Sequence, residues 1–180
     1  MDRLLFSSDL HGGTSSLISL LEKASTFQAQ KILLAGDTCP TEGGTFSEIL
    51  KTSTIPLLMV RGNCDNQYTF QSAGLNLPPA IRRVSFAGRT IVLIHGDVYM
   101  PSTVLDLHEH DILISGHTHC PSLSVNAEGI LRVNPGSPTY PRSRWGATYG
   151  FLDNERLEIR DFSTDSPLEG LRYYFKPRNT

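Results

Sequence analysis

The sequence predicts an α/β protein with mixed sheets. In its first half, short apolar runs typical of strands alternate with a segment whose apolar residues recur at helical spacing, which favours parallel pairing. In its second half, two apolar runs separated by Ala87-Gly88-Arg89 predict a hairpin, so antiparallel pairing enters there. The chain has 180 residues, within the range for one hydrophobic core, so we expect a single domain over residues 1–180.

The first half is expected to contain three strands and two helices. A strand over 3–8 ends at Asp9, and Gly12-Gly13 supplies a flexible loop before a helix over 14–27. Leu17, Leu20 and Ala24 lie on one face of that helix. A strand over 31–35, a weaker helix over 46–51 and a strand over 57–60 follow.

The second half is predicted to be rich in strands. The hairpin strands cover 81–86 and 90–95, and a short helix is expected over 101–110, with proline in its first turn. Further strands are expected over 111–115, 123–125, 130–133, 149–152 and 157–162. The tail from about residue 163 carries no clear pattern.

Composition limits the class of protein. Hydrophobic residues make up 39% and charged residues 19%, as in ordinary globular proteins. The formal net charge of −2 shows no basic stripe in bulk, which disfavours nucleic acid as a partner. No apolar run approaches the roughly 18 residues that span a bilayer, and the run Leu4–Phe6 is too short for a signal peptide. We therefore expect a cytoplasmic protein, without a membrane partner, whose three cysteines are free thiols.

Five short polar segments each follow an apolar run that is predicted to be a strand. The carboxyl ends of strands in an α/β sheet line one crevice, so these segments should converge. Their carboxylate, imidazole and amide groups suit borderline divalent cations better than Ca²⁺. The segments are Asp9-Leu10-His11, Gly36-Asp37, Gly62-Asn63-Cys64-Asp65, His95-Gly96-Asp97 and Gly116-His117-Thr118-His119.

These segments, in this order, together with Asn134-Pro135-Gly136-Ser137, resemble the calcineurin-like metallophosphoesterase family, in its small cap-less phosphodiesterase branch of bacteria and archaea. The resemblance covers roughly residues 1–160. It implies a four-layer α/β/β/α sandwich and an open site for a small phosphodiester substrate. The branch also suggests a homodimer.

The resemblance implies a dinuclear centre. Two cations roughly 3.5–4 Å apart would clamp a phosphoryl group and lower the pKa of a bridging water, so that hydroxide is available for attack. The implied cofactors are two divalent ions, with Mn²⁺ ranked first and Ni²⁺, Co²⁺, Fe²⁺, Zn²⁺ or Mg²⁺ as alternatives. One set of ligands would be Asp9, His11, Asp37 and His119, and the other Asp37, Asn63, His95 and His117. Catalytic roles are predicted for Asn63, Cys64, Asp65 and His95.

Two residues depart from the pattern of many relatives. Cys64 stands where they have a histidine that can protonate the leaving group, and a thiol of ordinary pKa, about 8.5, is a poorer acid there. A diester with a good leaving group would suffer least. Asp97 stands where relatives in the branch often have a second histidine, and its role is open.

Several other residues allow two interpretations. Arg61 could bind the substrate phosphate or pair with a carboxylate. The Tyr140, Arg142, Arg144 and Trp145 cluster could border the site or form an exposed loop, and Tyr173, Tyr174 and Phe175 could pack on the core or on a second subunit. His108-Glu109-His110 is interpreted as solvated, and Cys39 and Cys120 as packing beside the site.

Two other functions compete with the phosphodiesterase. The same fold resembles a eukaryotic coat-complex scaffold subunit that has lost catalytic ligands in the middle motifs, but Asp37 and Asn63 are intact here, which favours catalysis. A nuclease or a phosphomonoesterase is a minor alternative, because the charge is near neutral and Cys64 is a poor acid.

Overall fold

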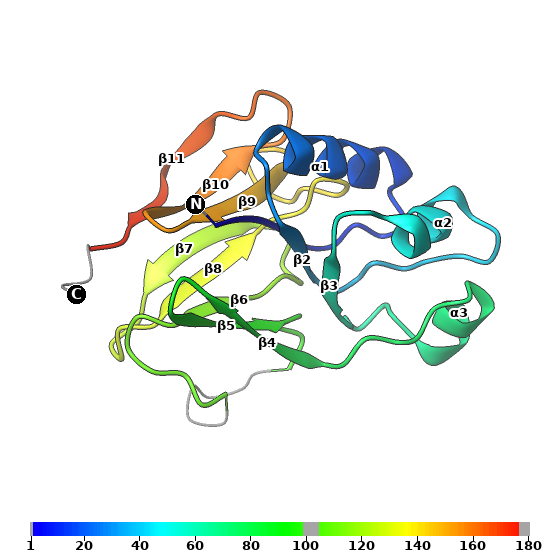
Figure 1. The fold of residues 1–180 in the computed structure, drawn as a ribbon, viewed down its shortest axis with the longest axis horizontal. Coiled ribbons are helices and arrows are strands. Elements are labelled where there is room, and N and C mark those ends of the chain that lie inside the picture. The colour runs from blue at the N-terminus through cyan, green and yellow to red at the C-terminus, as the bar shows by residue number, and fades with distance from the viewer. Residues whose placement is uncertain (1, 99–104, 177–180) are drawn as a thin grey trace.

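The computed structural model describes residues 2–98 and 105–176, which form two stacked mixed β-sheets (Figure 1). The six-stranded sheet has the order β11-β10-β9-β1-β2-β3. Its parallel part is β1 (Arg3–Ser7), β2 (Lys31–Ala35) and β3 (Leu57–Val60). Its antiparallel part is β9 (Thr148–Asp153), β10 (Arg156–Asp161) and β11 (Pro167–Tyr174).

The five-stranded sheet has the order β4-β5-β6-β8-β7. Strands β5 (Arg89–Ile94), β6 (Ile112–Ile114) and β8 (Leu131–Pro135) pair in parallel. Strands β4 (Ile81–Phe86) and β7 (Pro121–Val125) add antiparallel edges. The predicted α/β class with mixed sheets is therefore confirmed, and parallel strands occur in both halves of the chain.

Two helices cover the outer face of the six-stranded sheet. Helix α1 (Thr14–Thr26) and helix α2 (Thr45–Thr52) present an apolar side to β1 and β2. Leu17 and Leu20 are fully buried there against Leu5 and Ile32. Because helix residues three and four apart share a face, the spacing of these leucines places both on the sheet.

A third helix, α3 (Gln67–Ser72), was not predicted. Its N-cap is Asn66, whose side-chain oxygen accepts a hydrogen bond from the Thr69 backbone N–H at 3.0 Å. Asparagine is among the preferred N-cap residues, so Asn66 was the available signal. The helix has six residues and buries only Phe70, which leaves almost no periodic apolar pattern to detect.

The apolar core lies between the two sheets. Phe6 and Leu33 of the six-stranded sheet pack with Ile91 and Ile114 of the five-stranded sheet, and all four are fully buried. Alternate residues of each strand point to this layer, as the two-residue period of a strand requires. The ends of the strands are therefore fixed relative to one another across the interface between the sheets.

The outer face of the five-stranded sheet is covered by Leu105 and Leu107, which pack on Val92 and Leu113. Part of the helix predicted over 101–110 lies outside the described residues, and over 105–110 that prediction is wrong: the chain makes turns. The Asp111 carboxylate accepts a hydrogen bond from the His108 backbone N–H at 3.1 Å, which closes a turn instead of a helix. The described part of the layer on this face consists of turns, and the rest of the predicted helix lies outside the described residues.

The tail also has structure that the sequence did not predict. Strand β11 extends the six-stranded sheet beyond β10, and Tyr173 and Phe175 pack against the core between the sheets, whereas Tyr174 is 62% exposed. This decides between the two interpretations of the aromatic run for Tyr173 and Phe175. Within the described residues, none of the helices has the length and apolar character needed to cross a membrane.

Candidate metal centre

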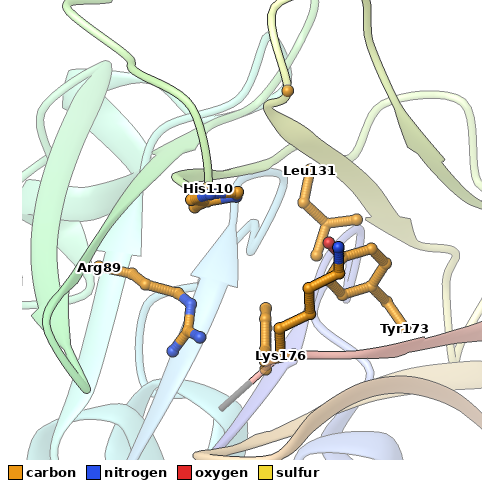
Figure 2. A pocket seen from close by; sticks show the side chains of 7 residues that line it. Arg89, His110, Leu131, Tyr173 and Lys176 are labelled. Atoms are coloured by element: carbon orange, nitrogen blue, oxygen red, sulfur yellow. The ribbon is translucent and has the colours of Figure 1, made fainter. Parts of the chain in front are cut away.

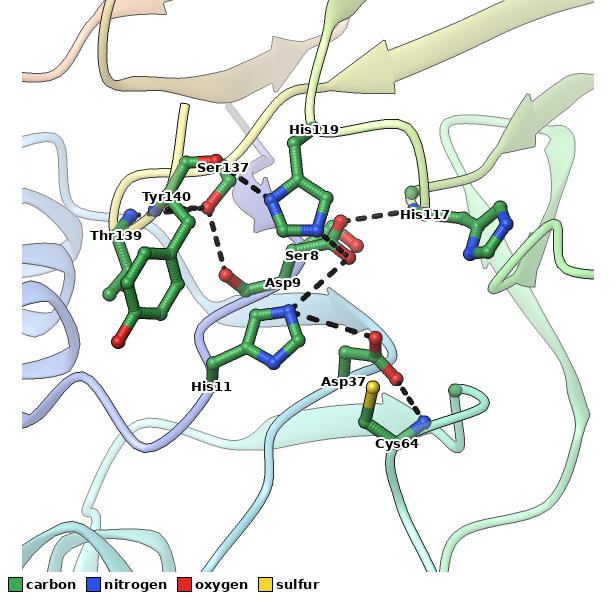
Figure 3. A network of polar contacts seen from close by, with 12 residues as sticks. Ser8, Asp9, His11, Asp37, Cys64, His117, His119, Ser137, Thr139 and Tyr140 are labelled. Carbon is green, nitrogen blue, oxygen red and sulfur yellow. Dashed lines mark hydrogen bonds and ion pairs between the residues drawn. The ribbon is translucent and has the colours of Figure 1, made fainter. Parts of the chain in front are cut away.

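Figure 3 shows four of the five polar segments meeting at one edge of the stacked sheets, and the fifth joins them through His95, whose Nε2 lies 3.4 Å from Asp37 Oδ2. They follow β1, β2, β3, β5 and β6, all of which run parallel to a neighbouring strand. The predicted convergence of the carboxyl ends is therefore observed for the polar side chains on these loops.

Asp9, His11 and His119 form the first group of donor atoms. Asp9 Oδ1 lies 3.3 Å from His119 Nε2 and 4.0 Å from His11 Nε2. The two imidazole rings stack with their centroids 5.2 Å apart. One donor atom from each of the three residues lies within 4.8 Å of the others, which is close enough to share one cation.

The second group adjoins the first through Asp37. Asp37 Oδ2 lies 3.7 Å from His11 Nε2 and 3.4 Å from His95 Nε2, between the two groups. Asn63 Oδ1 lies 3.1 Å from His95 Nε2 and 3.0 Å from His117 Nδ1. The seven predicted ligands are thus brought together, and Asp37 lies between the two groups of donor atoms.

Two buried atoms of the site have no hydrogen-bond partner among the described residues. They are Asp9 Oδ1 and His11 Nε2, and the Asp9 side chain is completely buried. A buried polar atom without a partner costs about 1–3 kcal/mol, and more when it is charged. A divalent cation beside both atoms would remove that cost, so the residues fit the metal that the resemblance implies.

The pKa values of Asp37 and His95 are shifted in opposite directions. Burial alone would raise the pKa of Asp37, but hydrogen bonds with His95 and with the Cys64 backbone N–H outweigh it and hold the pKa well below its usual range. Burial would lower the pKa of His95, but Asp37 and the Ala35 carbonyl raise it to about 9. A cation that binds the His95 imidazole would therefore compete with a proton for it.

Backbone carbonyls orient two of the histidines. His95 Nδ1 lies 2.8 Å from the Ala35 carbonyl oxygen, and His119 Nδ1 lies 2.7 Å from that of Tyr140. A carbonyl oxygen only accepts, so each Nδ1 carries the proton and each Nε2 faces the carboxylates. Such contacts fix the tautomer and the ring orientation of metal-binding histidines.

The ligand residues themselves adopt left-handed backbone conformations. Asp9, His11, Asp37, His117 and His119 have φ between 44° and 70°. This region is uncommon for residues other than glycine and clusters at functional sites. Glycines beside the ligands are expected to let the backbone approach the site closely or adopt positive φ, and two of them allow close approach: a side chain at Gly62 would overlap the Asp37 carboxylate, and one at Gly116 would overlap Ser8.

Cys64 and Asp65 occupy different positions beside the site. The Cys64 backbone N–H donates to Asp37 Oδ1 at 2.8 Å, and burial together with Asp37 raises the pKa of the Cys64 thiol to about 11. Asp65 Oδ1 accepts from the Cys39 backbone N–H at 2.8 Å and Oδ2 from that of Gly62 at 2.9 Å. The Asp65 carboxylate is thereby held by backbone groups and joins the loops after β2 and β3.

The other cysteines and the exposed histidines lie outside the two groups. Cys39 Sγ is 3.6 Å from His11 Nδ1, so Cys39 packs directly behind a predicted ligand. Cys120 Sγ donates to the Arg142 carbonyl at 3.1 Å. The side chains of His108 and His110 are 77% and 65% exposed, in agreement with their interpretation as solvated.

A groove of about 460 Å³ opens beside His11 and His119. Tyr140 and Arg142 line its outer side, and the Tyr140 ring packs edge-on against His11 with centroids 5.6 Å apart. Of the aromatic and basic cluster in the sequence, these two residues border the groove. Arg144 instead lies over Trp145, 4.7 Å from the ring centroid.

Arg61 and Asp97 line a smaller cavity, of about 160 Å³, on the other side of the site. His95 and Gly62 form part of the same lining, so both residues lie beside the second group of donors.

Comparison with known proteins agrees with this geometry. Residues 3–156 match the Calcineurin-like phosphoesterase superfamily domain. The phosphodiesterase YfcE of Escherichia coli K12 is 30% identical over 169 residues, covering 88% of this chain and 91% of YfcE. A solved structure of the E. coli phosphoesterase Yfce superimposes with a TM-score of 0.80 at 28% identity, over 92% of this chain and 96% of that one. A probable metallophosphoesterase of Methanothermobacter thermautotrophicus is 32% identical over 144 residues, covering 76% of this chain and 77% of that protein.

The fold and the cluster of aspartate and histidine residues thus define a phosphoesterase with a candidate metal site. The chain belongs to the calcineurin-like phosphoesterase superfamily, in the branch of small phosphodiesterases that includes YfcE. The zinc-bound Vps29 of Entamoeba histolytica shares the fold, with a TM-score of 0.68 at 21% identity over 97% of this chain and 99% of Vps29.

Proposed function

We propose that this protein is a metal-dependent phosphodiesterase that hydrolyses small phosphodiesters at a dinuclear centre. The observation that carries the proposal is the buried, unsatisfied pair Asp9 Oδ1 and His11 Nε2, with Asp37 placed between them and a second group of donors. Imidazole, carboxylate and amide donors together suit Mn²⁺, Fe²⁺, Co²⁺, Ni²⁺ or Zn²⁺. We rank Mn²⁺ first, as the family resemblance implies, and keep Mg²⁺ as an alternative. The ligands would be Asp9, His11, Asp37, Asn63, His95, His117 and His119.

Bound cations of this kind supply Lewis acidity, which activates water and neutralises charge on the phosphoryl group. The residues of this chain hold the metal-binding side chains in fixed positions. His95 and His119 are fixed by carbonyl oxygens, and Asp37 Oδ1 is held by the Cys64 backbone N–H. Because these contacts exist before any ligand arrives, no reorganisation is needed when negative charge develops in the transition state.

The groove beside His11 and His119 would hold one ester group of the substrate. The loop that forms it is anchored by Ser137, whose hydroxyl donates to the Asp9 carbonyl at 2.8 Å and accepts from the Tyr140 backbone N–H at 2.9 Å. The Tyr140 side chain nevertheless stays 56% exposed. A fixed, exposed aromatic ring favours substrates with a flat ester group, and Arg142 favours an additional negative charge.

A diester is preferred to a monoester because the chain offers a weak acid at the leaving-group position. The pKa of the Cys64 thiol, about 11, makes it a poor proton donor to an alkoxide near neutral pH. A diester with an acidic alcohol, such as nitrophenol, leaves without that proton. Asp65 is assigned a positioning role, since both of its carboxylate oxygens accept hydrogen bonds from backbone N–H groups.

The test is hydrolysis of bis(p-nitrophenyl) phosphate by chelator-stripped protein, with Mn²⁺, Ni²⁺, Co²⁺ or Mg²⁺ added singly. Bound metal is counted by elemental measurement on the same samples. We expect metal-dependent turnover, about two ions per chain and loss of both in Asp37→Asn. The matched control is Asp106→Asn, the same change at an exposed turn on the outer face of the five-stranded sheet, which should keep wild-type turnover.

Folded protein that shows no turnover with any metal would contradict the proposal for simple diesters. Metal bound without turnover would then favour the alternative of a non-catalytic scaffold subunit. One ion per chain with full turnover would keep the phosphodiesterase but reject the dinuclear centre.

A further inference from the structure

One of the three cysteines belongs to a group of possible metal donors. One ligand atom each from His11, Asp37 and Cys64 lies within 4.8 Å of the other two. Figure 3 shows the Cys64 sulfur directed from its loop toward Asp37. Ligand atoms around a tetrahedral Zn²⁺ ion lie roughly 3.3–3.8 Å apart, since each is about 2.0–2.3 Å from the metal. Rotation of the exposed Cys64 side chain about its χ1 bond can close the remaining difference.

The other two thiols face elsewhere. Cys39 Sγ lies 3.6 Å from His11 Nδ1, whereas the carboxylates lie beside Nε2 of the same ring. Cys120 Sγ donates to the Arg142 carbonyl at 3.1 Å. Among the described residues, neither Cys39 nor Cys120 belongs to a group of three or more possible metal donors. Cys64 is therefore the thiol that a cation at the site can reach.

A completely buried carboxylate atom beside this group has no partner. Asp9 is 0% exposed, and its Oδ1 has no hydrogen-bond partner among the described residues. The same holds for His11 Nε2, which lies 4.0 Å from Asp9 Oδ1 and 3.7 Å from Asp37 Oδ2. A buried anionic atom without a partner is costly unless a cation lies beside it. A cation that satisfies Asp9 and His11 therefore also lies beside the group that contains Cys64.

The polar contacts of Cys64 suit a sulfur that carries negative charge. Asn63 Nδ2 donates to Cys64 Sγ at 3.4 Å, and the Cys64 backbone N–H donates to Asp37 Oδ1 at 2.8 Å. The first contact places a donor on the sulfur, and the second fixes the loop beside the carboxylate. When such a sulfur binds a divalent cation, its S–H bond breaks, the proton goes to solvent and the electron pair goes to the metal.

A sulfur ligand changes which cations the group prefers. Thiolate is a soft ligand that suits Zn²⁺, whereas Mn²⁺ and Mg²⁺ prefer carboxylate, carbonyl and water oxygens. A site that holds Mn²⁺ therefore gains little from the Cys64 sulfur. A site that holds a thiophilic cation gains one more bond.

We propose that Cys64 is an additional ligand for the thiophilic divalent cations Zn²⁺, Co²⁺ and Cd²⁺, in the group that it forms with His11 and Asp37, and that it stays unbound with Mn²⁺. The inference rests on the proposed function, because it concerns the cations of the same site. It assigns part of the choice between those cations to one side chain.

The test uses the full chain, stripped of metal by a chelator and titrated with Co²⁺. A bond between Co²⁺ and thiolate gives a charge-transfer absorption in the near ultraviolet that nitrogen and oxygen ligands do not give. We expect this band in the wild type, growing in proportion to bound metal, and no band in Cys64→Ser. Because Cys64 is exposed, the variant should fold, and circular dichroism of the metal-free protein checks this.

Metal affinity provides a second measurement, by competition with a coloured chelator. Zn²⁺ binding should weaken at least about tenfold in Cys64→Ser, since even indirect partners of a metal contribute 10–100-fold to its affinity. Mn²⁺ binding should stay within about threefold of wild type, because Mn²⁺ has little preference for sulfur.

Three control variants should keep the band. Cys39→Ser and Cys120→Ser make the same change at thiols that face elsewhere. His110→Gln tests adventitious binding of Co²⁺ at a histidine that is 65% exposed. Figure 2 shows His110 beside a separate cavity, which lies at the first residue of β5, whereas His95 follows the last residue of that strand. Six strand residues span about 20 Å, so His110 is remote from the metal centre.

Three results would overturn the inference. The first is wild-type protein that holds Co²⁺, by elemental measurement, without a charge-transfer band. The second is an unchanged band or unchanged Zn²⁺ affinity in folded Cys64→Ser. The third is loss of the band in Cys39→Ser or Cys120→Ser but not in Cys64→Ser.

Failure of this inference and failure of the proposed function give different results. A Co²⁺ band that depends on Cys64, without hydrolysis of any diester, would reject the phosphodiesterase and keep Cys64 as a ligand. Turnover that depends on Mn²⁺, without a Co²⁺ band, would keep the phosphodiesterase and reject Cys64 as a ligand.

Discussion

Among the described residues, a buried cluster of charged residues at the metal centre and a partly buried one around Asp165 differ in how their polar atoms are satisfied. At the metal centre, Asp9 Oδ1 and His11 Nε2 have no hydrogen-bond partner among the described residues. The second cluster is here called the Asp165 cluster. Among the described residues, none of its buried side-chain nitrogen or oxygen atoms lacks a hydrogen-bond partner. Its members are Lys23, Tyr149, Glu158, Arg160 and Asp165.

The contacts of the Asp165 cluster are short and reciprocal. Asp165 Oδ1 accepts from Lys23 Nζ at 2.7 Å and from the Tyr149 hydroxyl at 2.8 Å. Arg160 donates through Nε to Glu158 at 3.0 Å and through Nη1 to the Asp165 carbonyl at 2.7 Å. Burial, together with the bond to Asp165, raises the pKa of Tyr149 well above its usual range. The two clusters therefore differ in whether their buried polar atoms are already paired within the described residues.

Among the variants that test the difference between the two clusters, Asp9→Asn is expected to have the largest effect on turnover. The amide keeps the oxygen that accepts from the His117 N–H but removes the charge beside His119. Turnover should fall by at least about 100-fold, because even indirect partners of a metal cost 10–100-fold. Thermal unfolding of the metal-free protein should be unchanged or shifted upward, since a buried unsatisfied charge is gone. A clear drop in metal-free stability would show that Asp9 is structural.

The opposite outcome is expected from Asp165→Ala. Lys23 and Tyr149 lose their partner, so the free energy of unfolding should fall by about 1–2 kcal/mol. The lower end of this range applies if solvent screens the ion pair, because Asp165 is partly exposed. Turnover per folded molecule should not change. Denaturant unfolding measures this, and the exposed pair Lys51–Glu48 provides the control, because Lys51→Gln should cost less than about 0.5 kcal/mol.

A smaller, pH-dependent effect is expected at Asp161, which joins β10 to the turn before β11. Its Oδ1 accepts from the Ser163 hydroxyl and from the backbone N–H groups of Ser163 and Thr164, and these bonds lower its pKa. The carboxylate therefore stabilises the fold above its unfolded pKa of about 3.9, and that contribution is lost as the pH falls through the lowered folded value.

The test is thermal unfolding of wild type and Asp161→Asn across pH 2–7. Wild type should be more stable by about 1 kcal/mol at pH 7, and the difference should shrink below about pH 4. A difference that is constant over this range would contradict a role for the ionised form.

The smallest effect on turnover is expected from Cys64→Ser. Because the pKa of the Cys64 thiol is about 11, it gives no useful proton to nitrophenolate, whose departure needs none. Turnover of bis(p-nitrophenyl) phosphate should stay within about threefold of wild type, far from the 10²–10⁴-fold that a general acid contributes. A loss of about 100-fold would assign Cys64 a direct role in the reaction.

Most strands and the convergence of the site were predictable from the sequence, because each depends on local signals. The apolar run Lys31–Ala35 and the pair Ile81–Phe86 and Arg89–Ile94 flanking a turn have such signals. Five polar segments at strand ends then predict where Asp9 and His119 meet.

The remaining features depend on tertiary contacts that no local pattern reveals. Strand β11 is held by pairing with β10, and the turns over 105–110 are held by Asp111 and by packing of Leu105 and Leu107 on the sheet. The positioning role of Asp65 follows from loops 26 residues apart meeting at its carboxylate. The Asp165 cluster likewise joins Lys23 to a residue 142 positions away.

The polar contacts around Asp9 join the two sheets to each other. Asp9 follows β1 of the six-stranded sheet, yet its carboxylate accepts from the His117 N–H and its carbonyl from Ser137, which both follow strands of the five-stranded sheet. His95 makes the reverse connection to the Ala35 carbonyl. Bound cations would strengthen this contact between the two sheets, because their ligands come from both sheets. Metal binding there would therefore also raise the free energy of unfolding of the protein.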